Sequence, residues 1–464
     1  MSTRRISSEA RVGNIGIGGQ NPIRIQSMAT VDTNDTEGCV AQAKRIIDAG
    51  GELVRFTTQG TREAENMKHI SARLKADGYT QPLVADVHFT AHTADVAAQY
   101  CEKVRINPGN YVDPGRTFKH LEYTDDEYAA ELQKIERQLV PFLNICREHH
   151  TAVRIGVNHG SLSDRIMSRY GDTPEGIVES CMEFLRIFKR EQFNDVVISI
   201  KASNTVVMVQ SVRLLVQAMD REDMHYPLHL GVTEAGEGED GRIKSAVGIG
   251  ALLTEGIGDT IRVSLSEEPE CEIPVARKLV DMIQECSRLR EEAEASIKDD
   301  TITLALDAPD WETLQLKAAM AVGGLLIDRK ATKLIVVPKS GSKFFTLHSS
   351  LFTSLADAIL QAARIKFTKT EYISCPGCGR TLYNLQDTIA KIKAATKEFV
   401  GLKIGIMGCI VNGPGEMADA DYGYVGAGRG KISLYKAKEC VERNIPEEEA
   451  VEKLLELIRK DRLS

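Results

Sequence analysis

Three cysteines near the C-terminal end have the spacing of metal ligands. Cys375 and Cys378 form a C-x-x-C pair in SCPGCGR, and Cys409 follows in MGCIVNGPGE. The chain has ten cysteines, but disulfides are not expected in a cytosolic chain of this length. Others, such as Cys146 and Cys181, lie in helix-like patterns and are expected to pack as small apolar residues. Any cofactor site is therefore expected at the C-x-x-C pair.

Two kinds of metal centre fit this pattern. A structural zinc site needs four ligands, commonly from two C-x-x-C pairs, and the sequence has no second pair. Cys440 could be a fourth ligand, but it lies in a helix-like, lysine-rich stretch. Iron–sulfur clusters are also held by thiolates, and Glu416, seven residues after Cys409, could supply a labile fourth ligand. The spacing favours a cluster and leaves zinc open.

A second set of polar residues stands at the ends of β-branched runs in the first 265 residues. Arg105 and Asn107 share one face of a run, because residues of equal parity point the same way in a strand. The same holds for Arg154 with Asn158 and for Arg262 with Ser264. The complete set of run-end residues is Arg55, His88, Arg105, Asn107, Arg154, Asn158, Lys201, Glu234, Arg262 and Ser264.

The elements that carry these residues alternate between strand and helix. Helical periodicity separates most of the runs, which is the signature of parallel βαβ units. The eight runs are Pro22–Met28, Glu52–Thr58, Pro82–His88, Lys103–Gly109, Ala152–Asn158, Asp195–Ser203, Pro227–Gly236 and Thr260–Leu265. Eight units in about 250 residues predict an α/β fold with an N-terminal (β/α)8 TIM-type barrel. A doubly wound open sheet is the competing interpretation.

A barrel would bring the run-end cations together, because the carboxyl ends of its strands meet at one mouth. Five buried cations are costly without anions, and the sequence offers only Glu234, Asp86 and Glu237 nearby. Arginine forks match phosphate oxygens, so a small phosphorylated ligand would satisfy the mouth. The alternative is that these cations form purely structural pairs with loop carboxylates.

The C-terminal third is expected to contain two further units. Strands at Thr301–Leu306 and Lys333–Pro338 flank a helix at Trp311–Leu326, which predicts a small α/β insert. The cysteine motifs lie in a C-terminal α/β domain that ends in an amphipathic helix at Pro446–Lys460. The expected domains are 1–287 (barrel), 288–360 (insert and linker) and 361–464 (metal domain).

Net charge and the lengths of apolar runs restrict the kinds of partner and the cellular location that we expect. The net charge of −8 argues against nucleic acid and anionic membranes. The segment Met1–Gly13 has no apolar core of a signal peptide, and no apolar run approaches the roughly 18–20 residues that span a bilayer. We therefore expect a cytoplasmic protein without a membrane partner.

Taken together, the motifs resemble the 4-hydroxy-3-methylbut-2-enyl diphosphate synthase family, which acts in the methylerythritol phosphate route to isoprenoids. The matching stretches are CPGCGR, MGCIVNGPGE, VRINPGN, RIGVNHGSL, SIKAS, HLGVTEAG and EGIGDTIRVSL. They occur in the family's order and cover about residues 20–285 and 355–440. CGRTL and GEMADADYGYVG look most like the plant-type branch, whose inserted third domain is here shortened to about 70 residues.

The resemblance implies a fold, a cofactor and a substrate. The fold would be a barrel followed by a [4Fe-4S] domain, and the substrate 2-C-methyl-D-erythritol 2,4-cyclodiphosphate, opened and dehydrated with electrons supplied one at a time. Ferredoxin or flavodoxin would be the donor, and we expect a homodimer. By motif match, the cluster ligands would be Cys375, Cys378, Cys409 and Glu416. The diphosphate would be bound by Arg55, Arg105, Arg154, Lys201 and Arg262, assisted by Asn107, Asn158 and Ser264. His88 and Glu234 would face the carbon skeleton, with Glu234 as proton donor.

Two rival functions stay open on the sequence. One is a different barrel enzyme, such as a pterin-type synthase or methyltransferase, with a structural zinc site. The other is an iron–sulfur sensor or scaffold whose barrel has no ligand. The first predicts bound zinc, and the second predicts a cluster with an unliganded mouth.

Overall fold

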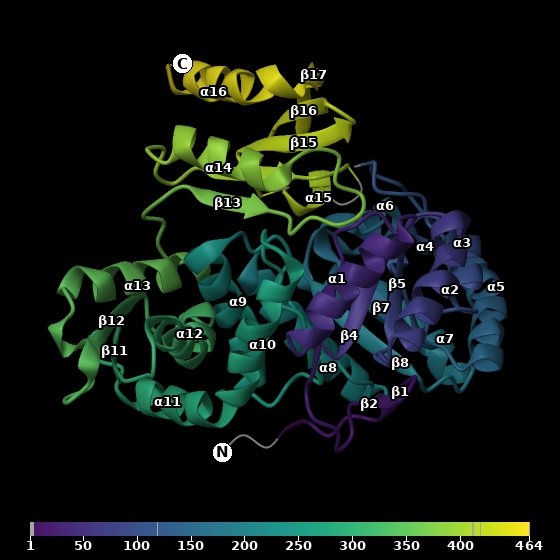
Figure 1. The fold of residues 1–464 in the computed structure, drawn as a ribbon, viewed down its shortest axis with the longest axis horizontal. Coiled ribbons are helices and arrows are strands. Elements are labelled where there is room, and N and C mark those ends of the chain that lie inside the picture. The colour runs from purple at the N-terminus through teal and green to yellow at the C-terminus, as the bar shows by residue number, and fades with distance from the viewer. Residues whose placement is uncertain (1–3, 118, 411–412, 418, 464) are drawn as a thin grey trace.

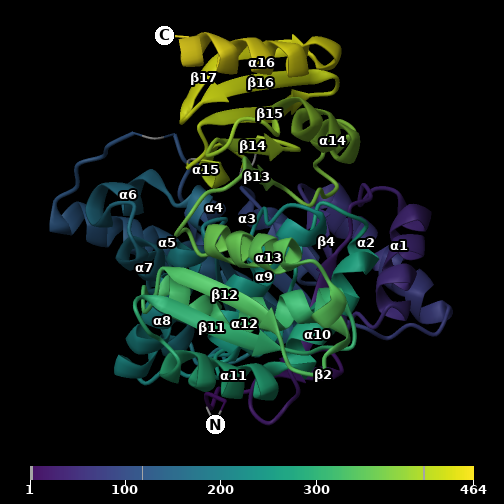
Figure 2. The same cartoon turned by 90° about the vertical axis from the view of Figure 1, so that its left-hand side faces the viewer.

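A computed structural model describes residues 4–117, 119–410, 413–417 and 419–463. The chain forms a barrel, an insert packed on the side of the barrel, and a C-terminal domain that stands over one end of it (Figures 1 and 2). We call the C-terminal domain, from Glu371 onward, the cysteine domain.

Eight parallel strands form the predicted barrel. Their hydrogen-bonded order is β8-β7-β6-β5-β4-β3-β10-β9, and a parallel bridge between Ile198 and Leu228 joins the two ends. The strands are β3 (Arg24–Met28), β4 (Leu53–Thr58), β5 (Leu83–Val87), β6 (Lys103–Ile106), β7 (Ala152–Asn158), β8 (Val196–Lys201), β9 (His229–Leu230) and β10 (Thr260–Ile261). Each lies within its predicted run, and the closed order excludes an open doubly wound sheet.

Helices cover the outside of the barrel with their apolar faces turned inward. α7 shows how the sequence sets such a helix: Thr173 caps its start by accepting from the Gly176 amide, and Pro174 occupies the first turn. The helices from the barrel region are α1 (Thr36–Asp48), α2 (Thr61–Ala76), α3 (Ala91–Ala97), α4 (Pro108–Tyr111), α5 (Asp125–His149), α6 (Asp164–Tyr170), α7 (Pro174–Arg190), α8 (Thr205–Arg221), α9 (Gly238–Leu253) and α10 (Glu272–Asp281).

A short hairpin closes the end of the barrel opposite the cysteine domain. Its strands are β1 (Ala10–Val12) and β2 (Ile15–Ile17), which pair antiparallel. Ala10, Val12 and Ile17 pack against the first inward layer of the strands, which includes Leu53 and Val197. Ligands therefore reach the barrel interior from the carboxyl ends of the strands.

The insert has the predicted strand–helix–strand order. β11 (Thr301–Leu306) and β12 (Lys333–Pro338) pair in parallel and flank α12 (Trp311–Ile327). The helix α12 is buried on nearly all sides, and it shares one hydrophobic core with the barrel. The proposed domain limits at 287/288 and 360/361 fall inside α11 (Ile283–Ala295) and α13 (Ser349–Ala362). The insert is therefore an extension of the barrel core rather than a separate core.

The cysteine domain is a five-stranded sheet with helices. Its strands follow the order β13-β14-β15-β16-β17. Its elements are β13 (Glu371–Ser374), α14 (Leu385–Thr396), β14 (Lys403–Met407), α15 (Gly413–Glu416), β15 (Tyr422–Gly428), β16 (Lys431–Lys436), β17 (Glu439–Pro446) and α16 (Glu447–Leu463). Cys440 lies in β17, so its predicted helical setting is wrong: pairing with β16 overrides the local pattern. The predicted C-terminal helix is confirmed as α16.

The cysteine domain rests directly on the barrel of its own chain. Ala235 and Ser374 form a parallel β-bridge between the two, and the Ser266 hydroxyl donates to the Cys375 carbonyl at 3.0 Å. Gly160 and Gly415 touch so closely that a Cβ built on Gly415 would lie 1.6 Å from the Gly160 oxygen. Only glycine permits this approach of two backbones.

No helix in the described ranges is both long and apolar enough to cross a lipid bilayer. The most apolar one, α12, has 17 residues and is covered by α9, α11 and α13.

Two adjacent glycines of α12 give a test of how the insert packs. A Cβ at Gly323 would meet the backbone oxygen and Cα of Val247 in α9 at 2.9 and 3.0 Å, whereas one at Gly324 would meet nothing closer than 3.6 Å. We expect Gly323→Ala to lower the free energy of unfolding by roughly 1–3 kcal/mol through overpacking. Gly324→Ala, the matched control, should raise it by up to about 1 kcal/mol, because alanine favours helix. Urea denaturation measures both, and equal effects would contradict this packing.

Candidate active site

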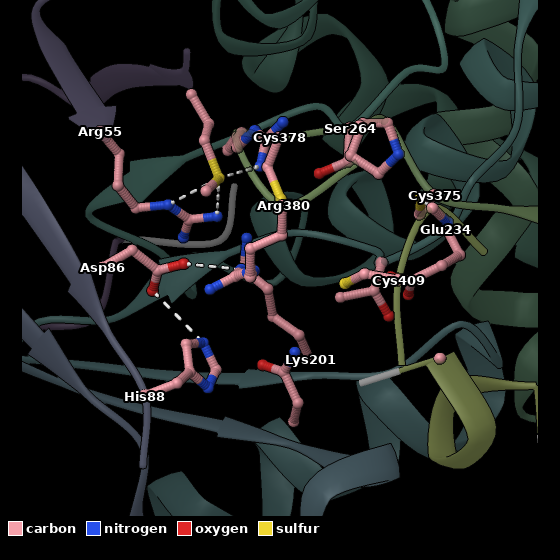
Figure 3. Close-up of a pocket in the computed structure, with 18 of the residues that line it drawn as sticks. Arg55, Asp86, His88, Lys201, Glu234, Ser264, Cys375, Cys378, Arg380 and Cys409 are labelled. Carbon is pink, nitrogen blue, oxygen red and sulfur yellow. Dashed lines mark hydrogen bonds and ion pairs between the residues drawn. The ribbon is translucent and has the colours of Figure 1, made fainter. Parts of the chain in front are cut away.

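A cavity between the barrel mouth and the cysteine domain brings most of the predicted site residues together. Figure 3 shows residues of both parts around it. The predicted residues that line it are Arg55, His88, Arg105, Arg154, Asn158, Lys201, Glu234, Arg262, Ser264, Cys375, Cys378 and Cys409. Met28, Asp86, Thr233, Arg380 and Gly408 also line it. The prediction that these cations converge on one mouth is confirmed, but Arg55 and Arg154 lie inside β4 and β7 rather than at their ends.

Two of the five mouth cations have carboxylate partners. Arg105 Nη1 lies 3.0 Å from Asp86 Oδ1, and Arg262 Nη2 lies 3.0 Å from Glu272 Oε1. These two pairs agree with the alternative interpretation, in which the cations are structural.

The other three cations have no carboxylate within ion-pair distance among the described residues. Arg55 donates to the sulfur of Met28 at 2.7 and 3.1 Å. Arg154 is 1% exposed, and its Nε and Nη1 have no hydrogen-bond partner in the described part of the chain. Lys201 is 4% exposed. Structural pairing therefore does not account for Arg55, Arg154 and Lys201.

Burial and mutual repulsion work against the charged state of this group. Burial lowers the pKa of Arg154 and of Lys201 well below their usual values, and neighbouring guanidinium groups lower both further. Burial likewise lowers the pKa of Arg55 to about 10. An anion bound among these three side chains would reverse both effects, since it supplies the missing opposite charge. The mouth therefore has an excess of buried basic groups that an anion with several negative charges would neutralise.

Asp86 and His88 form a fixed polar group at one wall of the cavity. Burial alone would raise the pKa of Asp86, but Arg55 and Arg105 hold it well below its usual range. Burial, followed by repulsion from Arg105, lowers the pKa of His88 to about 3. Its Nε2 lies close to Arg105, and its Nδ1 lies 3.2 Å from Asn110 Nδ2. His88 is thus a neutral ring near pH 7, able to orient a ligand but not to act as an imidazolium acid.

Two carboxyl groups meet where the barrel touches the cysteine domain. Thr233 Oγ1 donates to Glu416 Oε2 at 2.9 Å, and Ser203 donates to the Glu416 carbonyl at 3.0 Å. Burial raises the pKa of Glu234, and burial together with repulsion from Glu234 raises the pKa of Glu416 well above its usual value. Glu234 also has a left-handed backbone, with φ of 49°. Both shifts favour the protonated forms of these two carboxyl groups.

The three predicted cysteines lie together on the cysteine-domain side. Cys375 Sγ accepts from the Gly408 amide at 3.2 Å, and Cys375, Cys378 and Cys409 all line the cavity. Among the described residues, no three Cys, His, Asp or Glu side chains are arranged to hold a single metal ion. Cys440 lines a different surface hollow. The three thiols thus face the cationic mouth across one space.

The predicted polar neighbours divide into two kinds. Asn158 lines the cavity and accepts from Arg105 Nη2 at 3.1 Å. Ser264 lines it as well. Asn107 does not: its Oδ1 caps α4 by accepting from Gly109, and its Nδ2 donates to Ser161. Asn107 therefore holds the loop after β6 in place.

The sequence analysis missed several titratable residues at or below the mouth. Glu272 belongs to α10, and nothing in the sequence links it to Arg262. Arg380 lies two residues after Cys378, and its place beside the ligand motif was an available signal. Lys103 and His229 are buried deeper in the barrel, where burial lowers the pKa of both well below their usual values. Both are basic side chains beneath the cavity, and their burial disfavours the charged forms.

The fold and the site define an enzyme class: a barrel whose mouth is lined by basic side chains, capped by a domain that presents three thiols. Two family models match the chain, "GcpE TIM-barrel domain" over residues 7–277 and "GcpE protein C-terminal domain" over residues 371–460. The chain belongs to the GcpE family. The unmatched stretch between the two models contains the insert.

Curated relatives agree over nearly the full chain. The 4-hydroxy-3-methylbut-2-en-1-yl diphosphate synthase (flavodoxin) of Bacteroides fragilis is 52% identical over 604 aligned positions, covering 98% of this chain and 96% of the relative. The protein of that name from Phocaeicola vulgatus is 51% identical over 605 positions, covering 98% of each. These alignments are about 140 positions longer than this chain of 464 residues, so the relatives contain residues that it lacks.

The similarity of this chain to solved structures is low. An N-acetylneuraminic acid (sialic acid) synthetase from Leptospira borgpetersenii covers 61% of this chain and 90% of its own, at 14% identity and a TM-score of 0.37.

Replacing one of the three unpaired cations should weaken anion binding without lowering the stability of the fold. Arg154→Met and Lys201→Met should each weaken binding of inorganic pyrophosphate about ten- to a hundredfold, since charge-assisted hydrogen bonds contribute roughly 1.5–3 kcal/mol. Their thermal midpoints should stay equal or rise, because each change relieves repulsion. Calorimetric titration and thermal unfolding measure the two quantities.

The matched control is Arg165→Met. Arg165 is equally buried, but it pairs with Asp113 and Glu183 at 3.0 and 2.8 Å outside the cavity. Its loss should lower the midpoint and leave pyrophosphate affinity unchanged. Lower midpoints with unchanged affinity in the two mouth variants would contradict an anion-binding mouth.

Proposed function

We propose that the chain is an iron–sulfur oxidoreductase that converts 2-C-methyl-D-erythritol 2,4-cyclodiphosphate into 4-hydroxy-3-methylbut-2-enyl diphosphate. The observation that carries the proposal is the cavity itself, in which unpaired buried cations face three cysteines across one space. The cations suit a diphosphate and the thiols suit an iron–sulfur cluster. The names of the relatives support the same reaction.

The residues present fit a [4Fe-4S] cluster. Cys375, Cys378 and Cys409 would supply three thiolates, and Glu416 a fourth, oxygen ligand. Glu416 Oε1 is buried and has no hydrogen-bond partner among the described residues, as expected of a group that binds something else. The Gly408 amide would stabilise the Cys375 thiolate. When bound, the cluster would supply electrons one at a time together with a Lewis-acidic iron.

The barrel residues would hold the diphosphate while its charge grows. The reaction breaks a carbon–oxygen bond to the diphosphate, takes up two electrons and two protons, and releases one water. Arg55, Arg154 and Lys201 lack carboxylate partners among the described residues, so they are available to bind the developing oxyanion where it forms. Asp86 and Glu272 keep Arg105 and Arg262 aimed at the same space.

Glu234 would supply protons. Glu234 lines the cavity, and burial raises its pKa, so it suits the role of general acid. Glu416 lies beside Thr233 at the domain contact and keeps its proposed role as the oxygen ligand. Neutral His88 would orient the carbon skeleton by a hydrogen bond.

The partners follow from the same proposal. Flavodoxin is the donor suggested by the names of the relatives, and ferredoxin is the alternative. A cytoplasmic location and a homodimer stay predictions. The cysteine domain reaches the mouth of its own barrel, so one chain would suffice for a complete site.

Replacing the cysteines tests the cluster assignment. Cys375→Ser, Cys378→Ser and Cys409→Ser should each lose most iron and sulfide, because a neutral hydroxyl does not replace a thiolate. Cys146→Ser and Cys181→Ser, at buried helix positions outside the cavity, are the controls and should keep full iron content. Metal analysis after anaerobic purification is the measurement. Full iron content in any of the first three would remove that residue from the ligand set, and stoichiometric zinc would favour the zinc alternative.

A further inference from the structure

A surface hollow lies beside the cavity, between the barrel and the cysteine domain, and we call it the side hollow. On the barrel side, His88 lines the cavity and the next residue, Phe89, lines the side hollow. On the other side, Cys409 lines the cavity and Ile410 lines the side hollow. Figures 1 and 2 both show α15 next to α4, and both helices contribute to the lining. The side hollow is thus one residue of chain away from a proposed cluster ligand.

Two large apolar side chains are exposed at the side hollow. Phe89 is 50% exposed and Ile410 is 58% exposed. Neither side chain lines the cavity, so neither is needed there to contact a small substrate. Exposed apolar side chains that are grouped together and surrounded by polar residues mark a surface for association with another protein.

The backbone at Phe89 is held in an unfavourable conformation. Its φ is 64°, in the left-handed region, and the Thr90 amide donates to the His88 carbonyl at 2.9 Å. A Cβ built on Gly115 would lie only 2.9 Å from Phe89 Cε1, so glycine leaves room for the ring. Such strain in a bulky residue is found chiefly at functional sites. The tight turn here fixes an exposed aromatic ring directly after a residue of the cavity.

The lining of the side hollow is mainly basic. Its described residues include three basic side chains, Arg116, Lys438 and Arg443, and one acidic side chain, Glu439. Lys438 and Arg443 are exposed, whereas Arg116 lies 3.6 Å from Asp172, which is also 3.9 Å from Lys438. The whole chain has a net charge of −8. A negatively charged protein is therefore repelled by the chain as a whole and attracted to this face.

Another hollow that borders the cysteine domain has the opposite charge. None of the three cysteines lines it. Its lining contains four acidic side chains and two basic ones, which are Glu237, Glu239, Asp240, Glu267, Lys369 and Lys393. An acidic protein would be repelled there, so the side hollow is the better match in both charge and position.

We propose that the side hollow is the docking surface for the electron donor, a small acidic carrier protein whose cofactor lies at an exposed edge. Phe89 and Ile410 would form the apolar centre of the interface, and Lys438 and Arg443 its basic rim. An apolar centre with a charged rim suits a small, short-lived electron-transfer complex, in which charge sets the rate of encounter. The need for a carrier rests on the proposed function.

Electron delivery then requires two dockings in each turnover. The reduced carrier gives one electron to the enzyme and leaves oxidised by one electron, and no bond forms between the two proteins. A carrier that contacts Ile410 touches the residue next to Cys409. The two visits supply the two electrons that the proposed reaction consumes.

The test separates docking from chemistry, with flavodoxin as the probe carrier and anaerobically prepared holoenzyme. Calorimetric titration measures flavodoxin affinity. Lys438→Glu combined with Arg443→Glu should weaken binding about tenfold or more at low salt, because like charges then face each other. Added salt should weaken binding to wild type but not to this variant. Turnover driven by reduced methyl viologen, which needs no protein interface, should equal that of wild type.

A charge-matched control is Lys330→Glu combined with Lys333→Glu. Both lysines are exposed, and both lie on the insert, apart from the cysteine domain (Figure 2). This variant has the same net charge as the first and should bind flavodoxin nearly as wild type does. Phe89→Ala tests the apolar centre: it should weaken binding several-fold at high salt as well as at low salt.

The outcomes distinguish this inference from the proposed function. If flavodoxin and ferredoxin both fail to bind wild type, or bind the Lys438 and Arg443 variant as tightly as wild type, the inference is overturned. The proposed function still stands in that case if methyl viologen supports turnover. If wild type binds the carrier and the variant does not, the docking surface is supported even where no turnover occurs, and the proposed reaction alone fails. If the charge variant loses iron, Phe89→Ala decides, and unchanged affinity in it would overturn the inference.

Discussion

The burial of more positive than negative charge at the barrel mouth is the constraint on which the rest of the structure depends. Arg55, Arg154 and Lys201 lack carboxylate partners among the described residues, whereas buried charges in proteins are otherwise paired. The unpaired state is costly to folding, and the shared core of barrel and insert contributes the apolar burial that offsets it. A ligand with several negative charges resolves the imbalance, which is why the charge pattern alone points to a phosphorylated substrate.

The architecture places the three cysteines over this charge. Parallel strands direct their carboxyl ends to one mouth, the hairpin β1–β2 closes the other end, and the close approach of Gly160 to Gly415 seats the cysteine domain. The thiols and the cations come from opposite sides of the cavity, so neither part contains a complete site. This division explains why the contacts that hold the parts together, at Thr233, Ser266 and Asp86, lie beside the chemistry.

Much of this was predictable from the sequence, and the failures have physical reasons. Strand-end position placed Lys201 correctly, and the two-residue period with parallel barrel geometry turned Arg154 to the same cavity, although Arg154 lies inside β7 rather than at its end. Local rules could not predict the position of Arg380. Its barrel partner, Asp86, lies 294 residues away, and their contact depends on how the cysteine domain packs on the barrel. Asn107 has the parity of Arg105, but its side chain caps α4 instead of lining the cavity. Cys440 was assigned to a helix because strand pairing with β16 is not encoded in its neighbours. The apolar sequence of α12 predicted burial, although not against which surface.

The most direct test of the central claim is a single-turnover experiment with the holoenzyme. Anaerobic enzyme with full iron content is mixed with one equivalent of 2-C-methyl-D-erythritol 2,4-cyclodiphosphate and reduced flavodoxin, and the products are quantified by mass spectrometry. The account predicts one 4-hydroxy-3-methylbut-2-enyl diphosphate for every two electrons consumed. Enzyme that keeps its cluster and binds the cyclodiphosphate, yet leaves it unconverted with flavodoxin, ferredoxin or a chemical reductant, would contradict it.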